Sequence, residues 1–271
     1  MSVDGPRGVV LDLDGVVYRG SVLLPGAAEF LAWLREREVP FVFVTNNSTR
    51  SPREYVEHLR RLGVAAEEGQ VVTSALCAAA LLQRWRLAGR VLVVGGAGLR
   101  EAIREAGLEL ADGPEAEAVV VGLDVDLTYA RLRAACAAIR RGARFVATNL
   151  DPVLPVEGEL WPGAGALVAA IRTATGREPV VVGKPEAYPF EMALERLGTR
   201  PEDTLMVGDQ IATDVVGAQR VGMRTALVLT GVATRDDLGR EQVQPDLVVA
   251  DLAELLRQMR SGGEGCGRSC M

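Results

Sequence analysis

Short runs of β-branched and aliphatic residues alternate with segments of helical periodicity along almost the whole chain. The apolar runs, such as VVLDL and FVFVT, are nearly continuous, which is typical of strands that helices bury on both faces of a sheet. Strands that alternate with helices form βαβ units and parallel sheets, so the pattern predicts an α/β fold. The predicted strands are Gly8–Leu13, Pro40–Thr45, Arg90–Val94, Ala116–Val121, Arg144–Thr148, Pro179–Val182, Thr204–Gly208, Arg224–Leu229 and Asp246–Val249.

The helical segments carry start and stop signals at their ends. Ser51 and Glu54 have the spacing of a capping box, in which the glutamate side chain returns to the N-cap amide. Glycines stand where helices would need a left-handed C-cap, at Gly63, Gly107 and Gly198. The predicted helices are Ala27–Glu38, Arg53–Leu62, Leu99–Ala106, Tyr129–Arg140, Ala164–Ala174, Pro189–Leu197 and Ala212–Val221.

The composition narrows the class of protein. The chain has 271 residues, of which 48% are hydrophobic, so it can bury a sizeable core. Its net charge is −6 and its basic residues are scattered, which argues against a nucleic-acid-binding surface. No uncharged apolar run approaches the ~20 residues that span a bilayer, and the N-terminus lacks a signal-peptide pattern. We therefore expect a cytoplasmic protein with no membrane partner.

The histidine and cysteine residues indicate neither a zinc site nor a disulfide framework. His58 is the single histidine, which excludes a His-rich metal site. Cys77 and Cys136 lie in Ala-rich helical stretches, where we expect them to be small packing residues. Cys266 and Cys270 lie in a Gly-rich stretch without other metal-ligand types, so we predict no metal site there.

Polar residues gather at the carboxyl ends of several predicted strands, the edge at which open parallel sheets bind ligands. The first strand ends in Asp12 and Asp14, which flank a leucine. Two acids this close at the end of an apolar strand are costly unless a cation neutralises them. Mg²⁺ prefers such oxygen ligands, so the pair favours a magnesium site. An N-cap or Asx turn would explain one of the aspartates but not both.

Three further strand ends carry candidate site residues. Thr45 and Asn46 offer a hydroxyl and amides that could hold a phosphate, although a simple polar loop explains them equally well. Lys184 is the single lysine of the chain, and its compact ammonium can bridge a carboxylate and a phosphate as a point charge. Asp209 is a candidate metal ligand with Asp214 in the outer shell, the alternative being that Asp209 is only a helix N-cap.

Taken together, these groups resemble, in number and order, the four sequence motifs of the haloacid dehalogenase superfamily. The long interval before VVGKP, and the stretches VTNNS and PVEGELWPGAGA, are similar to the NagD-type or p-nitrophenylphosphatase branch. The resemblance implies a Rossmann-like parallel-sheet core with an inserted α/β cap. We place the core at 1–80 and 179–260, the cap at 81–178 and a flexible tail at 261–271.

The resemblance also implies a role for each residue. Asp12 would be the nucleophile that forms an aspartyl-phosphate, and Asp14 the general acid and base. Mg²⁺ would be held by Asp12, Asp209 and the backbone carbonyl of Asp14, with Asp214 in support. An acid at Asp14 favours a phosphatase over a dehalogenase, because an alkoxide needs a proton to leave and a halide does not. The phosphoryl group would be bound by Thr45, Asn46 and Lys184.

We therefore expect an Mg²⁺-dependent phosphatase that hydrolyses a small phosphorylated metabolite, such as a sugar phosphate, phosphoglycolate, glycerol phosphate or a nucleoside monophosphate. Two alternatives stay open, namely a phosphotransferase of the same mechanism and a non-catalytic sensor of phosphorylated metabolites. Substrate choice would lie in the cap, where Asn149, Asp151 and Trp161 are candidates. Alternatively, this cap loop only shields the site from water. The resemblance further implies a homodimer formed through the cap.

Overall fold

The computed structural model describes residues 5–156, 159–239 and 242–264. The chain forms two compact units, each made of segments that are distant in sequence. The first unit comprises Met1–Val44, His58–Gln70 and Phe190–Met271, and the second comprises Thr45–Glu57 and Val71–Pro189. The second unit thus begins before the predicted cap range and ends after it, and the predicted domain boundaries stay a prediction.

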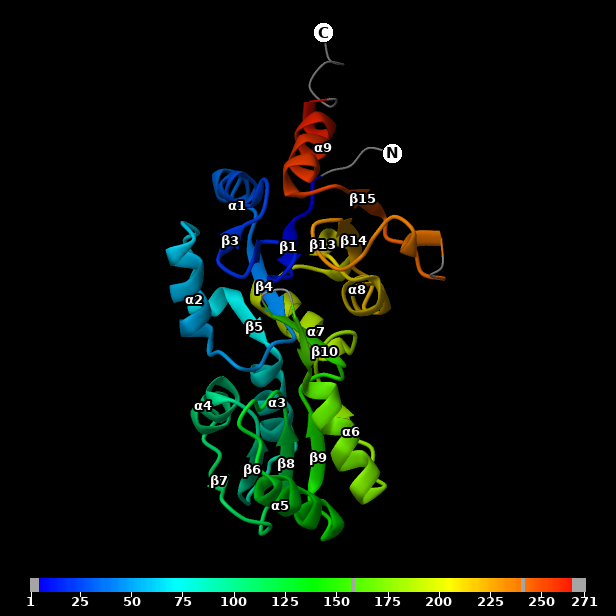
Figure 1. Ribbon diagram of the computed structural model, residues 1–271. Helices are drawn as coiled ribbons and strands as arrows, with labels where there is room; N and C mark the ends of the chain where they lie inside the picture. Colours follow the sequence, from blue (N-terminus) through cyan, green and yellow to red (C-terminus); the bar gives the residue numbers. More distant parts are fainter. Residues whose placement is uncertain (1–4, 157–158, 240–241, 265–271) are drawn as a thin grey trace. The chain divides into compact units, whose positions relative to one another are not determined.

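A parallel sheet forms the centre of the first unit. Its strands are β1 (Gly8–Leu11), β4 (Phe41–Thr45), β13 (Thr204–Gly208), β14 (Arg224–Val228) and β15 (Leu247–Val249). They lie side by side in the order β15-β14-β13-β1-β4 (Figure 1). Leu11 of β1 pairs with Val207 of β13 on one side and with Phe43 of β4 on the other. The carboxyl ends of β1 and β13 are therefore neighbours, because the two strands run in the same direction.

Two helices of the first unit, α1 (Ala27–Glu36) and α9 (Leu252–Glu264), pack against each other. The contact is close at the start of α1. A Cβ added at Gly26 would come 2.1 Å from the amide nitrogen of Ala253, so only glycine permits this approach. Gly26 also has a φ of 78°, a left-handed conformation that glycine adopts without strain.

Helix α9 continues through Glu264, whereas the sequence predicted a flexible tail from residue 261. The leucines in the first part of the helix are buried and anchor it, namely Leu252, Leu255 and Leu256. Residues 265–271, which include Cys266 and Cys270, lie outside the described part of the chain.

The other elements of the first unit are short. They are the hairpin strands β2 (Tyr18–Arg19) and β3 (Val22–Leu23), 3₁₀ turns at Glu68–Gln70, Pro201–Asp203 and Asp237–Gly239, a π-helical turn at Ile211–Val215, and α8 (Val216–Arg220). Two longer helices, α2 (Pro52–Arg61) and α7 (Ala187–Leu197), contain residues of both units.

A second parallel sheet lies in the second unit. Its strands are β6 (Val91–Val94), β7 (Leu110–Ala111), β8 (Ala118–Val121), β9 (Arg144–Ala147) and β12 (Val180–Val181). Their order is β12-β9-β8-β6-β7. Helices α5 (Tyr129–Arg140) and α6 (Ala164–Thr175) pack on one face of this sheet, over side chains such as Val94 and Val121 (Figure 1). The alternating residues Val93 and Val120 are buried as well, so both faces are covered.

The remaining elements of the second unit are β5 (Val71–Thr73), α3 (Ser74–Arg84), α4 (Ala97–Glu105) and an antiparallel hairpin of β10 (Val153–Val156) and β11 (Glu159–Pro162). The side chain of Thr73 caps α3 by accepting a hydrogen bond from the Leu76 amide at 3.2 Å. Helices α3 and α4 pack against each other.

The pattern-based prediction of an α/β fold is confirmed. The predicted strands and helices are present with ends that differ by at most two residues, except at Ala212–Val221, where a π-helical turn (Ile211–Val215) precedes the short helix α8 (Val216–Arg220). The Glu54 side chain accepts a hydrogen bond from the Ser51 amide at 2.8 Å, as a capping box requires. The three predicted C-cap glycines all have positive φ values, at Gly63, Gly107 and Gly198. Within the described residues, no helix is long and apolar enough to cross a membrane.

The two described cysteines are packing residues, as the sequence predicted. Cys77 and Cys136 are both buried. Burial raises the pKa of the Cys136 thiol, so this side chain stays protonated and unreactive at neutral pH.

Candidate active site

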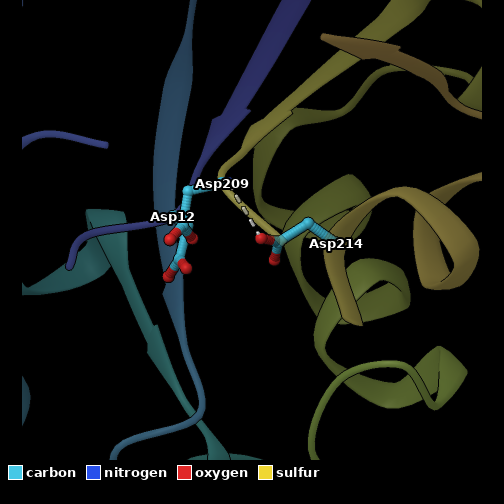
Figure 2. A group of neighbouring side chains, drawn as sticks. All are labelled: Asp12, Asp209 and Asp214. Atoms are coloured by element: carbon cyan, nitrogen blue, oxygen red, sulfur yellow. Dashed lines mark hydrogen bonds between the residues drawn. The ribbon is translucent and has the colours of Figure 1, made fainter. Parts of the chain in front are cut away.

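Asp12 and Asp209 directly follow two neighbouring strands of the first unit. The Asp12 amide donates to the Val207 carbonyl at 2.9 Å, which keeps Asp12 in register with β13. Only 6% of Asp12 and 1% of Asp209 is exposed. Figure 2 shows the carboxylates of Asp12 and Asp209 close together, beyond the ends of their strands. Adjacent parallel strands thus bring together two acids that are far apart in the sequence.

Asp214 comes from the π-helical turn that follows Asp209. The Val215 amide bonds to the Gln210 carbonyl, five residues earlier, which is the spacing of a wide turn. This turn directs the Asp214 side chain back toward the strand end. There Asp214 Oδ2 accepts hydrogen bonds from the amides of Asp209 and Gln210, both at 3.1 Å (Figure 2). Asp214 therefore fixes the backbone that carries Asp209.

Glycine at position 208 is required by this arrangement. A Cβ added there would lie 2.2 Å from the Cβ of Asp214. At this distance the two backbone segments must move apart. We expect Gly208→Ala to destabilise the protein by about 2 kcal/mol, the range of an overpacked buried site, and to displace Asp214. Urea unfolding of the variant and the wild type measures the change in free energy.

The matched control for this substitution is Gly69→Ala. Nothing lies within 4 Å of a Cβ added at Gly69, so this variant should unfold like the wild type. Equal stability of Gly208→Ala and Gly69→Ala would contradict the close contact between Gly208 and Asp214.

The three carboxylates form a candidate metal site. Asp12, Asp209 and Asp214 are all buried, and one oxygen of each lies within 4.8 Å of the others. Three buried like charges at this spacing destabilise the folded state unless a cation balances them. The donor set consists of hard carboxylate oxygens, which suits Mg²⁺ or a similar divalent ion. These residues therefore fit the metal that the sequence predicted.

Asp14 is placed differently from these three residues. It is exposed, and its side chain is not part of the group of buried carboxylates. The turn that carries it is held by hydrogen bonds from the Val17 amide to the Leu13 carbonyl and from the Gly15 amide to the Tyr18 carbonyl, both at 2.9 Å. Asp14 thus stands exposed on a well-defined turn, two residues after Asp12.

A loop after β14 also contacts this region, and the sequence analysis did not predict it. The Val232 amide donates to Asp209 Oδ2 at 2.8 Å, and the Thr230 hydroxyl donates to the Gly15 carbonyl at 2.6 Å. A Cβ added at Gly231 would lie 1.8 Å from Asp209 Oδ2. The sequence could have indicated this loop, because it follows the carboxyl end of β14, the strand beside β13.

The predicted phosphate-binding residues lie in the second unit. Thr45, at the end of β4, is buried, and its hydroxyl accepts a hydrogen bond from the Asn47 amide at 3.2 Å. Asn46 Oδ1 accepts from the Lys184 amide at 2.7 Å, and Asn46 Nδ2 donates to the Lys184 carbonyl at 3.0 Å. Only 4% of Lys184 is exposed. Asn46 and Lys184 are therefore in direct contact.

Two of the three predicted specificity residues join this contact. Asp151 Oδ2 accepts from Asn46 Nδ2 at 3.2 Å, and Asn149 Nδ2 donates to the Asn46 carbonyl at 2.8 Å. With apolar residues including Leu123 and Leu154, they line a small pocket in the second unit. Trp161 does not line it. Its ring is partly exposed on β11, where it donates to Glu159 Oε2 at 2.9 Å.

Comparison with known families agrees with this arrangement. Residues 9–109 match a model described as haloacid dehalogenase-like hydrolase, and residues 181–255 match a second one described as HAD-hydrolase-like. A relative named 5'-nucleotidase YutF, from Bacillus subtilis strain 168, is 40% identical over 248 residues, or 92% of this chain and 96% of that protein. An acid sugar phosphatase from Staphylococcus saprophyticus is 37% identical over 93% of this chain and 98% of that protein.

Solved structures give the same result. The 4-nitrophenylphosphatase of Thermotoga maritima superposes with a TM-score of 0.88 at 37% identity, covering 93% of this chain and 97% of that one. NagD from E. coli K-12 superposes with a TM-score of 0.85 at 32% identity, covering 92% and 98% of the two chains. The chain belongs to the haloacid dehalogenase-like hydrolases. Within that family it is an enzyme of the phosphatase type, similar to NagD and the p-nitrophenylphosphatases.

Proposed function

We propose that this enzyme hydrolyses a small phosphomonoester in an Mg²⁺-dependent reaction, through an aspartyl-phosphate on Asp12. The observation that carries the proposal is the buried group of Asp12, Asp209 and Asp214 at the carboxyl ends of β1 and β13. The relatives named 5'-nucleotidase and acid sugar phosphatase support a nucleoside monophosphate or a sugar phosphate as the substrate.

In this proposal Asp12, Asp209 and the backbone carbonyl of Asp14 hold the cation, and Asp214 supports it from the outer shell. When bound, Mg²⁺ supplies positive charge that lowers the repulsion between an anionic nucleophile and an anionic phosphate. Asp214 acts on the ligands as well, because it bonds the amides of Asp209 and Gln210 and so orients the Asp209 side chain.

The first chemical step forms the aspartyl-phosphate. A carboxylate oxygen of Asp12 bonds to phosphorus while the bond from phosphorus to the ester oxygen breaks. The Asp14 carboxyl gives its proton to the departing oxygen, so the product leaves as an alcohol. The carboxylate left on Asp14 regains a proton from the attacking water in the second step, and the exposed position of Asp14 keeps it accessible to that water.

The second step releases phosphate. The Asp14 carboxylate takes a proton from a water molecule, whose oxygen then bonds to phosphorus. The bond between phosphorus and Asp12 breaks, which restores the Asp12 carboxylate and frees inorganic phosphate. If an added alcohol took the place of this water, the enzyme would act as a phosphotransferase, and the alcohol phosphate would accumulate.

The side chains of Lys184 and Thr45 are proposed to bind the phosphoryl group. We expect Lys184→Ala to lower kcat/KM by about 100-fold or more, the usual cost of removing one charged donor from a reacting oxyanion. The inhibition constant for inorganic phosphate should rise in the same variant. A fall in unfolding temperature with unchanged kinetics would instead make Lys184 a structural residue.

The proposal is tested by phosphate release from p-nitrophenyl phosphate, measured for the wild type and for Asp12→Asn with Mg²⁺ and with excess EDTA. Activity that needs both Asp12 and the cation would support the mechanism and justify a screen of nucleoside monophosphates and sugar phosphates. Activity that needs neither would refute it.

A further inference from the structure

We propose that Asn46 is a positioning residue that fixes Lys184 through the lysine's own backbone, rather than a phosphate ligand through its side chain. The inference rests on the proposed function, in which Lys184 binds the phosphoryl group. It assigns to the Asn46 side chain a role that the sequence did not predict.

The side-chain amide of Asn46 holds both polar backbone groups of Lys184. Its Oδ1 accepts from the Lys184 amide at 2.7 Å and its Nδ2 donates to the Lys184 carbonyl at 3.0 Å. Two hydrogen bonds from one planar group fix the position and the rotation of the Lys184 backbone, as a neighbouring strand would. Strand β12 ends at Val181, before the lysine. Beyond the strand end, the Asn46 side chain supplies hydrogen bonds to the Lys184 backbone.

The chemistry of the partners fixes the orientation of this amide. The Lys184 carbonyl and the Asp151 carboxylate both accept, so the atom facing them must be the nitrogen. The Lys184 amide donates, so the atom facing it must be the oxygen. Both N–H groups of the Asn46 side chain are therefore engaged by protein acceptors. A phosphate could gain a donor from this side chain only by breaking one of these bonds.

Close packing holds Asn46 itself in place. The Asn46 carbonyl accepts from Asn149 Nδ2 at 2.8 Å and from the Ser74 hydroxyl at 2.5 Å. A Cβ added at Gly183, next to the lysine, would lie 2.6 Å from Asn46 Oδ1 and 2.2 Å from the Thr148 carbonyl. The backbone at Gly183 therefore lies so close to the Asn46 side chain that it leaves no room for a Cβ. The bonds to the backbone carbonyl stay with any residue at position 46, whereas a side chain of different length or charge would not keep the two hydrogen bonds to Lys184.

A double-mutant cycle tests whether Asn46 acts through Lys184. Asn46→Ala, Lys184→Ala and the double variant are compared by kcat/KM for p-nitrophenyl phosphate. We expect Asn46→Ala to lower kcat/KM by about 100-fold in the wild-type background, since a displacement near 1 Å costs that much in a positioned site. In the Lys184→Ala background the same change should cost less than about twofold. Equal losses in both backgrounds would overturn the inference.

The cycle is repeated with inorganic phosphate as the probe, so that it does not depend on turnover. Phosphate raises the unfolding temperature of a protein that binds it. The rise should shrink in Asn46→Ala and should be equally small in Lys184→Ala and the double variant. A rise that falls further in the double variant would show that Asn46 binds phosphate independently.

Two further variants act as controls. Asn47→Ala removes the neighbouring asparagine, whose Oδ1 accepts from the Thr49 amide and hydroxyl, and its effect should be the same in both Lys184 backgrounds. Asn46→Asp keeps the size and the acceptor but turns an oxygen toward the Lys184 carbonyl and Asp151, so it should be as damaging as Asn46→Ala. Full activity of Asn46→Asp would contradict the inference.

Failure of the proposed function and failure of this inference give different results. If kcat/KM does not respond to Lys184→Ala, the proposed role of Lys184 is wrong and the inference falls with it. If Lys184→Ala lowers kcat/KM but Asn46→Ala costs the same in both backgrounds, only the inference is wrong.

Discussion

Asp12→Asn should lower kcat for the release of phosphate from p-nitrophenyl phosphate by about 10⁴-fold or more, because the substitution removes the nucleophile of the proposed covalent mechanism. An amide oxygen carries no charge and is a poor nucleophile toward phosphorus. The substitution is nearly isosteric, and an asparagine oxygen can still accept the hydrogen bond that the Leu13 amide gives to Asp12 Oδ1 at 2.8 Å. The variant should therefore fold and still bind phosphate.

The control for this variant is Asp236→Asn, which makes the same chemical change at an exposed position of the same unit. Its kcat should equal that of the wild type. Rapid mixing of the wild type with substrate should in addition show phosphate bound covalently to the protein, which Asp12→Asn should lack. If Asp12→Asn kept more than a tenth of the wild-type kcat, the aspartyl-phosphate mechanism would be refuted.

Removal of the proposed divalent cation should also lower the activity strongly. We expect dialysis against EDTA to lower kcat by about 10³-fold, since a metal ion contributes several kcal/mol to the stabilisation of a phosphoryl-transfer transition state. Added Mg²⁺ should restore the activity, which shows that the loss is not due to unfolding. Full activity after exhaustive chelation would refute a metal-dependent mechanism.

The cation should also stabilise the protein in the absence of substrate. Asp12, Asp209 and Asp214 are buried with carboxylate oxygens within 4.8 Å of one another, so a cation relieves their repulsion only in the folded state. Mg²⁺ should therefore raise the unfolding temperature of the wild type. The increase should be smaller in Asp209→Asn, in which one of the three charges is removed. An equal increase in both proteins would show that the cation does not bind at Asp209.

The fold could be predicted where burial leaves a clear pattern. The central strands of both sheets are buried on two faces and read as continuous apolar runs. The hairpins left no such signal. Strands β2 and β3 have two residues each, too few for any period, and β10–β11 exposes large apolar residues such as Leu160 on its surface. Their pairing depends on turns and contacts that periodicity does not report.

The site could be predicted only in part for a similar reason. The rule that ligands lie at the carboxyl ends of parallel strands pointed to Asp12 and Asp209. The role of the Asp214 side chain depends on a π-helical turn, which no local sequence pattern indicates. Asn46 and Lys184 are 138 positions apart, and their two hydrogen bonds exist only in the folded chain.

Lys184 is the single lysine of the chain, so the protein carries one ε-amine, and that amine is almost entirely buried. Acetylation, ubiquitin attachment and amine-reactive crosslinkers act on lysine side chains, and this sequence offers them one such side chain. Each of these modifications consumes the ammonium charge or its hydrogen-bond donors. The enzyme therefore has no lysine at which it could be marked for regulation or degradation without disabling the group proposed to bind its substrate.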